Sequence, residues 1–144
     1  MSQREQIPST AARFVVLWHQ VPPSHLGSAG TASGRTAESH YDLMFEVGNS
    51  LRTWATPIWP LPIGQPMPAT ELAPHRRHYL DYEGPISANR GTVQRMAAGR
   101  FLALDDLPEA FRVRWETDTE GGVLLFTNGQ VTAIMAFPTR AIDT

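Results

Sequence analysis

Two histidines and one aspartate are the residues of this chain whose types and spacing fit a metal site. His40 and Asp42 lie two positions apart in the alternating segment His40–Val47, and in a strand their side chains would share one face, roughly 7 Å apart at Cα. His19 ends the apolar segment Arg13–His19 and is placed to add a third ligand from a neighbouring strand. This set predicts a site for Mn²⁺, Fe²⁺ or Zn²⁺. The alternative is three ordinary polar residues on a solvated strand face.

A second cluster of functional groups, from His75 to Tyr79, combines what phosphoryl chemistry requires. His75 can serve as a general acid, and Tyr79 offers a phenolic donor. Arg76 and Arg77 can pair with phosphate oxygens, where negative charge develops during the reaction. The alternative is a basic surface turn whose tyrosine packs against the domain.

Length and composition place the chain among ordinary globular domains. It has 144 residues, of which 42% are hydrophobic and 18% charged, enough for one core. The absence of cysteine excludes disulfides, zinc–thiolate sites and a thiol nucleophile. No apolar run approaches the ~20 residues of a membrane span, and the first ten residues are polar rather than signal-like. We therefore expect a cytoplasmic protein without a membrane segment.

The charge pattern is more informative than the net charge of −2, which does not indicate a nucleic-acid binder. The stretch from Arg76 to Arg100 holds five arginines and two acids, whereas the stretch from Asp105 to Glu120 holds six acids and two arginines. Such a distribution predicts one basic and one acidic side, and the basic side could contact phosphate locally.

The elements that must position these residues are mostly short strands. We expect a flexible tail over 1–12, a single domain over 13–144, and loops at 20–39 and Pro57–Pro68. Helical turns are predicted at Ala69–Ala73 and Asp106–Ala110. The predicted strands are Arg13–His19, His40–Val47, Ser50–Thr56, Gly91–Met96, Arg100–Leu104, Phe111–Thr117, Val123–Thr127 and Gln130–Phe137.

These strands predict a mainly β fold. Eight or so short strands in one domain favour a closed or nearly closed antiparallel β-barrel with one or two short flanking helices, because closure removes exposed strand edges.

Several motifs follow one another in a fixed order between residues 13 and 101. They are His19 after an apolar strand, His40-Tyr41-Asp42 with Glu46, Leu51–Pro57, His75 with Tyr79, Tyr82-Glu83-Gly84, Gly91-Thr92-Val93 and Gly99. This order resembles the 3′-phosphoesterase module of bacterial DNA ligase D, with its H-Y-D-x-R-L-E strand and its S-W-A-x-P and D-H-P-x-x-Y-x-x-F-E-G segments. No ligase or polymerase module accompanies it, so we expect a stand-alone version.

The resemblance implies an enzyme that depends on Mn²⁺, with Zn²⁺ and Fe²⁺ as alternatives. Its substrates would be nucleic-acid 3′ ends carrying a terminal ribonucleotide or phosphate, and other DNA end-repair proteins would be its partners. His19, His40 and Asp42 would be the metal ligands. His75 and Tyr79 would contact the scissile phosphate, with His75 as the proton donor.

One departure from the family pattern bears on catalysis. Met44 stands where the family has an arginine two residues after the ligand aspartate. A thioether cannot neutralise a phosphate oxygen, and losing such a contact costs about 2–4 kcal/mol, or ~10²–10³ in rate. Arg52, Arg76 and Arg77 are the predicted substrate-binding residues that could replace it.

Other departures lie nearer the N-terminus and leave other functions open. The family's N-terminal acidic and arginine-bearing segment is not recognisable in residues 1–12, and the loop 20–39 adds His25, interpreted as a plain loop histidine. One alternative is a nucleic-acid or phosphate-binding module of the same fold that has lost turnover. Another is a phosphoesterase for a small molecule, which the net negative charge favours.

Overall fold

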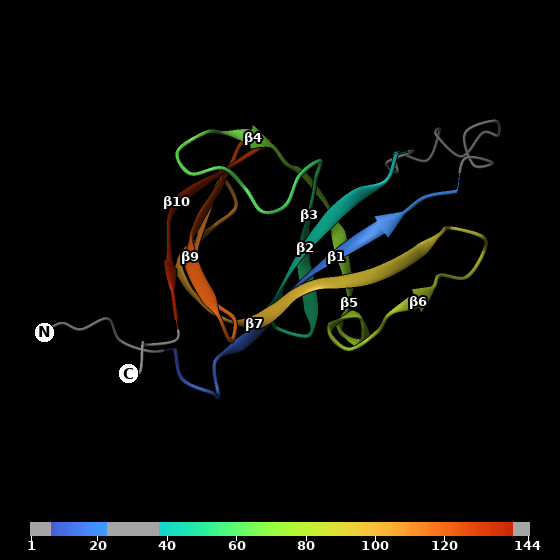
Figure 1. The fold of residues 1–144 in the computed structure, drawn as a ribbon, viewed down its shortest axis with the longest axis horizontal. Helices are drawn as coiled ribbons and strands as arrows, with labels where there is room; N and C mark the ends of the chain where they lie inside the picture. Colours follow the sequence, from blue (N-terminus) through green and yellow to red (C-terminus); the bar gives the residue numbers. More distant parts are fainter. Residues whose placement is uncertain (1–6, 23–37, 140–144) are drawn as a thin grey trace, which may run out of the picture.

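The computed structural model describes residues 7–22 and 38–139, and most of them form β-strands (Figure 1). Residues 1–6 of the predicted tail 1–12 and the loop residues 23–37, including His25, lie outside the described residues, whereas Ile7 is buried and Ala12 begins the first strand. The elements are β1 (Ala12–Gln20), β2 (His40–Val47), β3 (Ser50–Thr56), β4 (Met67–Pro68), β5 (Thr70–Arg76), the 3₁₀ helix η3 (Arg77–Leu80), β6 (Gly84–Pro85), β7 (Thr92–Leu107), β8 (Ala110–Glu116), β9 (Glu120–Thr127) and β10 (Gln130–Pro138).

The strands form one curved antiparallel sheet in the order β4-β10-β9-β8-β7-β1-β2-β3-β5, and β6 adds to β7 (Figure 1). The mainly β prediction is confirmed. Closure of a barrel is not observed, because no ladder joins the edge strands β4 and β5 in the part of the chain described. These two strands are nevertheless separated along the chain by Ala69 alone, a buried residue of the core.

Two predicted elements differ in the structure. Most of the predicted helical turn Ala69–Ala73 belongs to β5, because this segment pairs with β3. The segment Asp106–Ala110 comprises the end of β7, a two-residue turn at Pro108 and Glu109, and the first residue of β8. The strands predicted at Gly91–Met96 and Arg100–Leu104 belong to one long strand, β7. Gly99 does not interrupt it: a Cβ there would lie 1.8 Å from the Glu116 carbonyl oxygen of β8, so the glycine permits close pairing.

Alternation along β1 and β2 divides the buried residues between two apolar clusters, one on each face of these strands. The interior cluster contains Phe14, Val16, Leu43, Phe45, Trp54, Leu61, Ala69, Phe101, Phe111, Val113, Trp115, Leu124, Phe126, Val131 and Ala133. The outer cluster contains Val15, Leu17, Met44, Leu51, Leu80 and Val93. Because Leu80 belongs to η3, the outer cluster attaches the 3₁₀ helix to the sheet.

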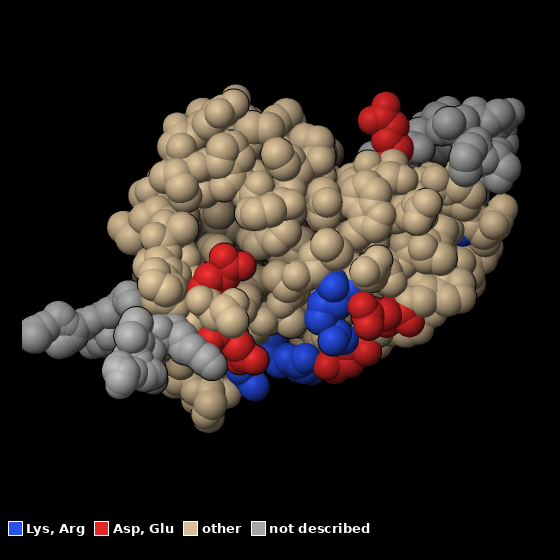
Figure 2. Space-filling view, in the orientation of Figure 1, with Lys and Arg blue, Asp and Glu red and all other residues tan. Residues whose placement is uncertain are grey.

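Charged side chains are sparse on the face shown in Figure 2, where acidic and basic groups intermix along one edge. Two ion pairs join η3 and its C-terminal neighbour to the first strands, Arg13 with Asp81 and Arg77 with Glu46. The predicted separation into a basic and an acidic side is therefore not visible on this face. Within the described ranges, no helix has the length and apolar character needed to cross a membrane.

Candidate metal centre and adjoining cavity

The pairing of β1 with β2 brings the three predicted metal ligands together. His19 lies directly opposite His40, and Asp42 lies two residues farther along β2 on the same face. One potential ligand atom from each residue falls within 4.8 Å of the others. His40 Nε2 is 3.0 Å from Asp42 Oδ1, and His19 Nδ1 is 3.7 Å from Asp42 Oδ2.

Backbone carbonyls orient both imidazole rings. The Nδ1–H of His40 donates to the Glu38 carbonyl at 2.7 Å, and the Nε2–H of His19 donates to the Arg90 carbonyl at 2.8 Å. Because a carbonyl oxygen only accepts, each bond assigns the proton to that nitrogen. In the neutral rings the other nitrogen, Nε2 of His40 and Nδ1 of His19, is an acceptor directed at the Asp42 carboxylate.

The Asp42 carboxylate is the buried charge of this cluster. Asp42 is only 2% exposed and His40 6%. Although His40 Nε2 is close to Asp42 Oδ1, this oxygen has no hydrogen-bond partner among the described residues. A buried carboxylate oxygen without a hydrogen bond is costly. Together with one nitrogen of each imidazole, the carboxylate gives three acceptors that fit a cation, so the residues present are suited to a divalent metal.

The two histidines differ in their affinity for protons. Burial lowers the pKa of His19 and outweighs the opposing effects of the Arg90 carbonyl and Asp42. Burial also opposes the charged form of His40, but close contact with Asp42 prevails and raises its pKa. The lowered pKa favours the neutral form of His19, which is the form that binds a metal, whereas at His40 a metal must compete with a proton.

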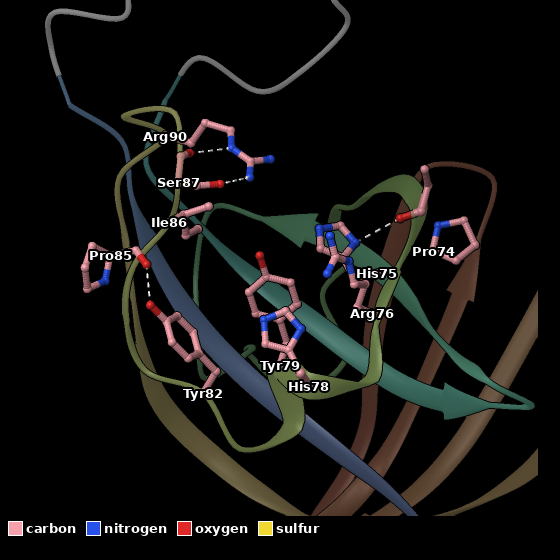
Figure 3. A pocket seen from close by; sticks show the side chains of 11 residues that line it. Pro74, His75, Arg76, His78, Tyr79, Tyr82, Pro85, Ile86, Ser87 and Arg90 are labelled. Atoms are coloured by element: carbon pink, nitrogen blue, oxygen red, sulfur yellow. Dashed lines mark hydrogen bonds between the residues drawn. The ribbon is translucent and has the colours of Figure 1, made fainter.

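A surface cavity of about 480 Å³ adjoins the metal cluster through Arg90 and is lined by all of the second predicted cluster except Arg77 (Figure 3). Its lining consists of Ala73, Pro74, His75, Arg76, His78, Tyr79, Tyr82, Pro85, Ile86, Ser87 and Arg90. The rings of His75 and Tyr79 make an edge-to-face contact with centroids 5.8 Å apart. The Tyr82 hydroxyl donates to the Pro85 carbonyl, while the Tyr79 hydroxyl makes no hydrogen bond within the described ranges.

An irregularity in edge strand β5 places His75 on the side of the metal cluster. The β3–β5 register shifts between Leu51 and Thr53, so that Leu51 of the outer cluster lies opposite His75. Such a bulge redirects side chains and accommodates Pro74 at the sheet edge. His75 lies close enough to His19 for its charge to lower the pKa of that ring. The His75 Nδ1–H donates to the Ala73 carbonyl at 2.9 Å, which fixes the ring.

The predicted substrate-binding arginines are placed differently from one another. Arg76 is exposed and lines the cavity. Arg77 pairs with Glu46 and does not line it.

Arg52 is committed to a separate network. It bonds with Glu71 and Asp106 and stacks over the Trp54 and Phe111 rings, at 4.7 and 4.8 Å, without lining the cavity. Met44, at the position of the family arginine, is 1% exposed in the outer cluster and supplies only packing.

Arg90 is the site residue that sequence reasoning missed. Its carbonyl orients His19 and its side chain lines the cavity. The available signal was its place in the arginine-rich stretch, immediately before the Gly91-Thr92-Val93 motif. Nothing in the sequence alone connected it to His19.

Comparison with protein-family models and with curated protein sequences gives no match for this chain. The class of site is therefore defined by its own geometry. Two oriented imidazoles and a buried carboxylate, whose Oδ1 has no hydrogen-bond partner in the described part of the chain, form a candidate divalent-metal centre, and beside it lies a cavity lined by histidine, tyrosine and arginine.

Proposed function

We propose that this protein is a divalent-metal-dependent phosphoesterase. The single observation that supports this most is the convergence of His19, His40 and Asp42, where a buried oxygen of Asp42 has no hydrogen-bond partner within residues 7–22 and 38–139. The adjoining cavity adds an acid–base group, a phenol and cations. This combination suits hydrolysis of a phosphate ester, where charge must be neutralised and a leaving oxygen protonated.

The residues divide the chemistry among them. A divalent cation held by His19, His40 and Asp42, with Mn²⁺ preferred over Zn²⁺ or Fe²⁺, would neutralise charge on the phosphate. His75 is fixed by its Nδ1–H bond to the Ala73 carbonyl, so its protonated ring presents Nε2–H as the general acid for the leaving oxygen. The free Tyr79 hydroxyl donates to a non-bridging oxygen.

The proposed substrate is a 3′-terminal phosphate ester of nucleic acid, either a terminal ribonucleotide or a 3′-phosphate. The order of motifs shared with the ligase D phosphoesterase module supports this choice, and Arg76 at the cavity supports an anionic ligand. The proposal includes cytoplasmic action in DNA end repair beside other repair proteins. We also propose that the sheet closes into a barrel: its two edge strands, β4 and β5, would meet through side-chain packing around Ala69 rather than through a hydrogen-bonded ladder.

A turnover assay tests the proposal. The protein is incubated with Mn²⁺ and primers that end in a 3′-phosphate or a 3′-ribonucleotide, and product is followed on gels. We expect hydrolysis by the wild type and by His25→Ala, the matched histidine control, but none by His40→Ala. Equal turnover by His40→Ala, or no turnover by the Mn²⁺-loaded wild type, contradicts the proposal.

The buried Met44 favours a second candidate, a phosphate-binding module that does not turn over substrate. This candidate predicts that Mn²⁺-loaded protein retains the 3′-phosphorylated primer without product. Salt separates nucleic-acid binding from binding of a small phosphoester, because affinity for an oligonucleotide falls steeply with salt concentration.

A further inference from the structure

Arg90 is the residue that connects the metal cluster to the cavity. Its backbone carbonyl accepts the Nε2–H of His19 at 2.8 Å. Its side chain lies at the rim of the cavity, across from His75 and Arg76 (Figure 3). One residue thus contacts a metal ligand through its main chain and can reach a bound substrate through its side chain.

The Arg90 guanidinium is held in place but not neutralised. Its Nε donates to the Ser87 carbonyl at 2.8 Å and its Nη2 to Ser87 Oγ at 3.1 Å. No carboxylate pairs with it in the part of the chain that the structure describes. Two of the five guanidinium N–H donors are used, so the others remain for a ligand. A planar guanidinium that is held in a fixed orientation and has N–H donors to spare is suited to binding phosphate oxygens.

The loop that carries Arg90 has an unusual backbone. Ala88 and Asn89 have positive φ angles of 61° and 56°, and the Ile86 N–H donates to the Gly91 carbonyl at 2.8 Å to close the loop. Gly91 is required because a Cβ there would lie 2.0 Å from the Gln20 carbonyl oxygen. The loop is therefore packed against the end of β1, where His19 lies, and the strain at Ala88 is retained at this site.

We propose that Arg90 binds the substrate phosphate and supplies the positive charge that the strand bearing Asp42 lacks. On that strand the position two residues beyond Asp42 is the buried Met44, which offers no charge. Arg90 approaches the same region from the β6–β7 loop instead, and its carbonyl keeps His19 aligned. This inference rests on the proposed function and names a substrate-binding residue for it.

Calorimetric titration with Mn²⁺ alone, and then with inorganic phosphate on the Mn²⁺-loaded protein, tests the role. Arg90→Ala retains the backbone carbonyl, so its Mn²⁺ affinity should stay near that of the wild type. Its phosphate affinity should fall about tenfold or more, as expected for a lost charge-assisted bond. Arg90→Lys should recover part of the loss, since lysine restores the charge without the fork. Arg95→Ala is the matched control, an exposed arginine of β7 outside the cavity, and should bind both like the wild type.

The outcomes separate this inference from the proposed function. If the wild type binds Mn²⁺ and phosphate and Arg90→Ala does so equally well, the inference fails while the proposed function stands. If Arg90→Ala loses affinity for both Mn²⁺ and phosphate, the inference also fails, because the side chain would then serve to hold the loop and His19 in place rather than to bind phosphate. A wild-type protein that binds no Mn²⁺, or binds Mn²⁺ but no phosphate, overturns both.

Discussion

The two faces of β1 and β2 both bury apolar side chains, but they differ at the end where His19 and His40 lie. On the interior face the side chains remain apolar, and Phe45 contacts the rings of Phe14, Trp54, Phe101, Phe111 and Phe126. On the outer face Val15, Leu17 and Met44 pack in the same way at first. The row then changes to His19, His40 and Asp42, of which two are nearly as buried as the residues before them.

This difference indicates where stability and chemistry reside in the fold. Aromatic packing dominates the interior face, where Trp115 Nε1 is a buried donor without a hydrogen-bond partner among the described residues, but no charged group is buried in that cluster. On the outer face, polar groups are buried beside a small apolar cluster, and the described residues offer no hydrogen bond to Asp42 Oδ1. Packed neighbours fix the ligands, so a metal can bind without reorganising them.

The largest effect is expected from breaking the interior face. Phe45→Ala should lower the free energy of unfolding by about 3–5 kcal/mol, because it removes the ring at the centre of the aromatic cluster. Met44→Leu on the outer face conserves volume and should cost less than about 1.5 kcal/mol. Urea unfolding followed by tryptophan fluorescence measures both. A loss below that of Met44→Leu would show that the interior face does not dominate stability.

Breaking the outer face should instead affect the metal. Asp42→Asn should reduce Mn²⁺ affinity by more than ~100-fold, since loss of even an outer-shell partner typically costs 10–100-fold. Without metal, and at a pH where both histidines are neutral, the variant should be at least as stable as the wild type, because a neutral amide replaces a buried carboxylate. Calorimetry with Mn²⁺ and urea unfolding with chelator test the two statements. Unchanged Mn²⁺ affinity would remove Asp42 from the site.

Local patterns in the sequence were enough to predict the strands that carry the metal ligands. β2 and β3 have the predicted bounds because strict alternation and the Gly48-Asn49 turn specify them locally. The helical turn predicted at Ala69–Ala73 was wrong, because pairing with β3, which the local sequence does not encode, overrides the helical propensity of this segment. The extent of β7 was missed because Gly99 marks close strand pairing rather than a turn.

The site residues, like the strands, could be predicted where a local pattern places them and were missed where an irregularity of the backbone does. The convergence of His40 and Asp42 required only the two-residue period of a strand, and His19 required only that β1 pair with β2. The position of His75 depends on a bulge in an edge strand, and that of Arg90 on a loop with two positive φ angles. Neither irregularity has a local sequence signal, so the contribution of Arg90 could be found only in three dimensions.

A smaller effect should appear where charge, rather than packing, holds the outer layer. Glu46 accepts a hydrogen bond from the Arg13 backbone N–H at 3.0 Å and pairs with Arg77 of η3. The Arg13 N–H bond, aided by Arg77 and opposed by burial, lowers the pKa of Glu46. A lowered carboxyl pKa stabilises the fold above the ordinary value near 4.5, and this stabilisation is lost as pH falls through the lowered pKa.

Glu46→Gln tests this contribution. At pH 7 it should cost about 1 kcal/mol, since Arg77 is half-exposed and its charge is screened by solvent. The difference between wild type and variant should shrink as the pH is lowered toward 3. Urea unfolding of both proteins at pH 7, 5 and 3 measures it. A difference that stays constant with pH would mean that packing, not the charge of Glu46, attaches η3.

The smallest effect should come from relieving the strain in the loop that carries Arg90. Ala88 has a φ of 61°, which costs a non-glycine residue about 1–2 kcal/mol, whereas glycine adds roughly 0.5–1 kcal/mol of chain entropy in the unfolded state. Ala88→Gly should therefore stabilise the protein by only ~0.5 kcal/mol in urea unfolding. If the strained turn serves to fix the guanidinium, the same change should also weaken phosphate binding while leaving Mn²⁺ affinity unchanged. Greater stability with undiminished phosphate affinity would mean that the strain has no part in binding. The functional part of the outer face would then consist of the metal ligands and would not include the strained backbone of the Arg90 loop.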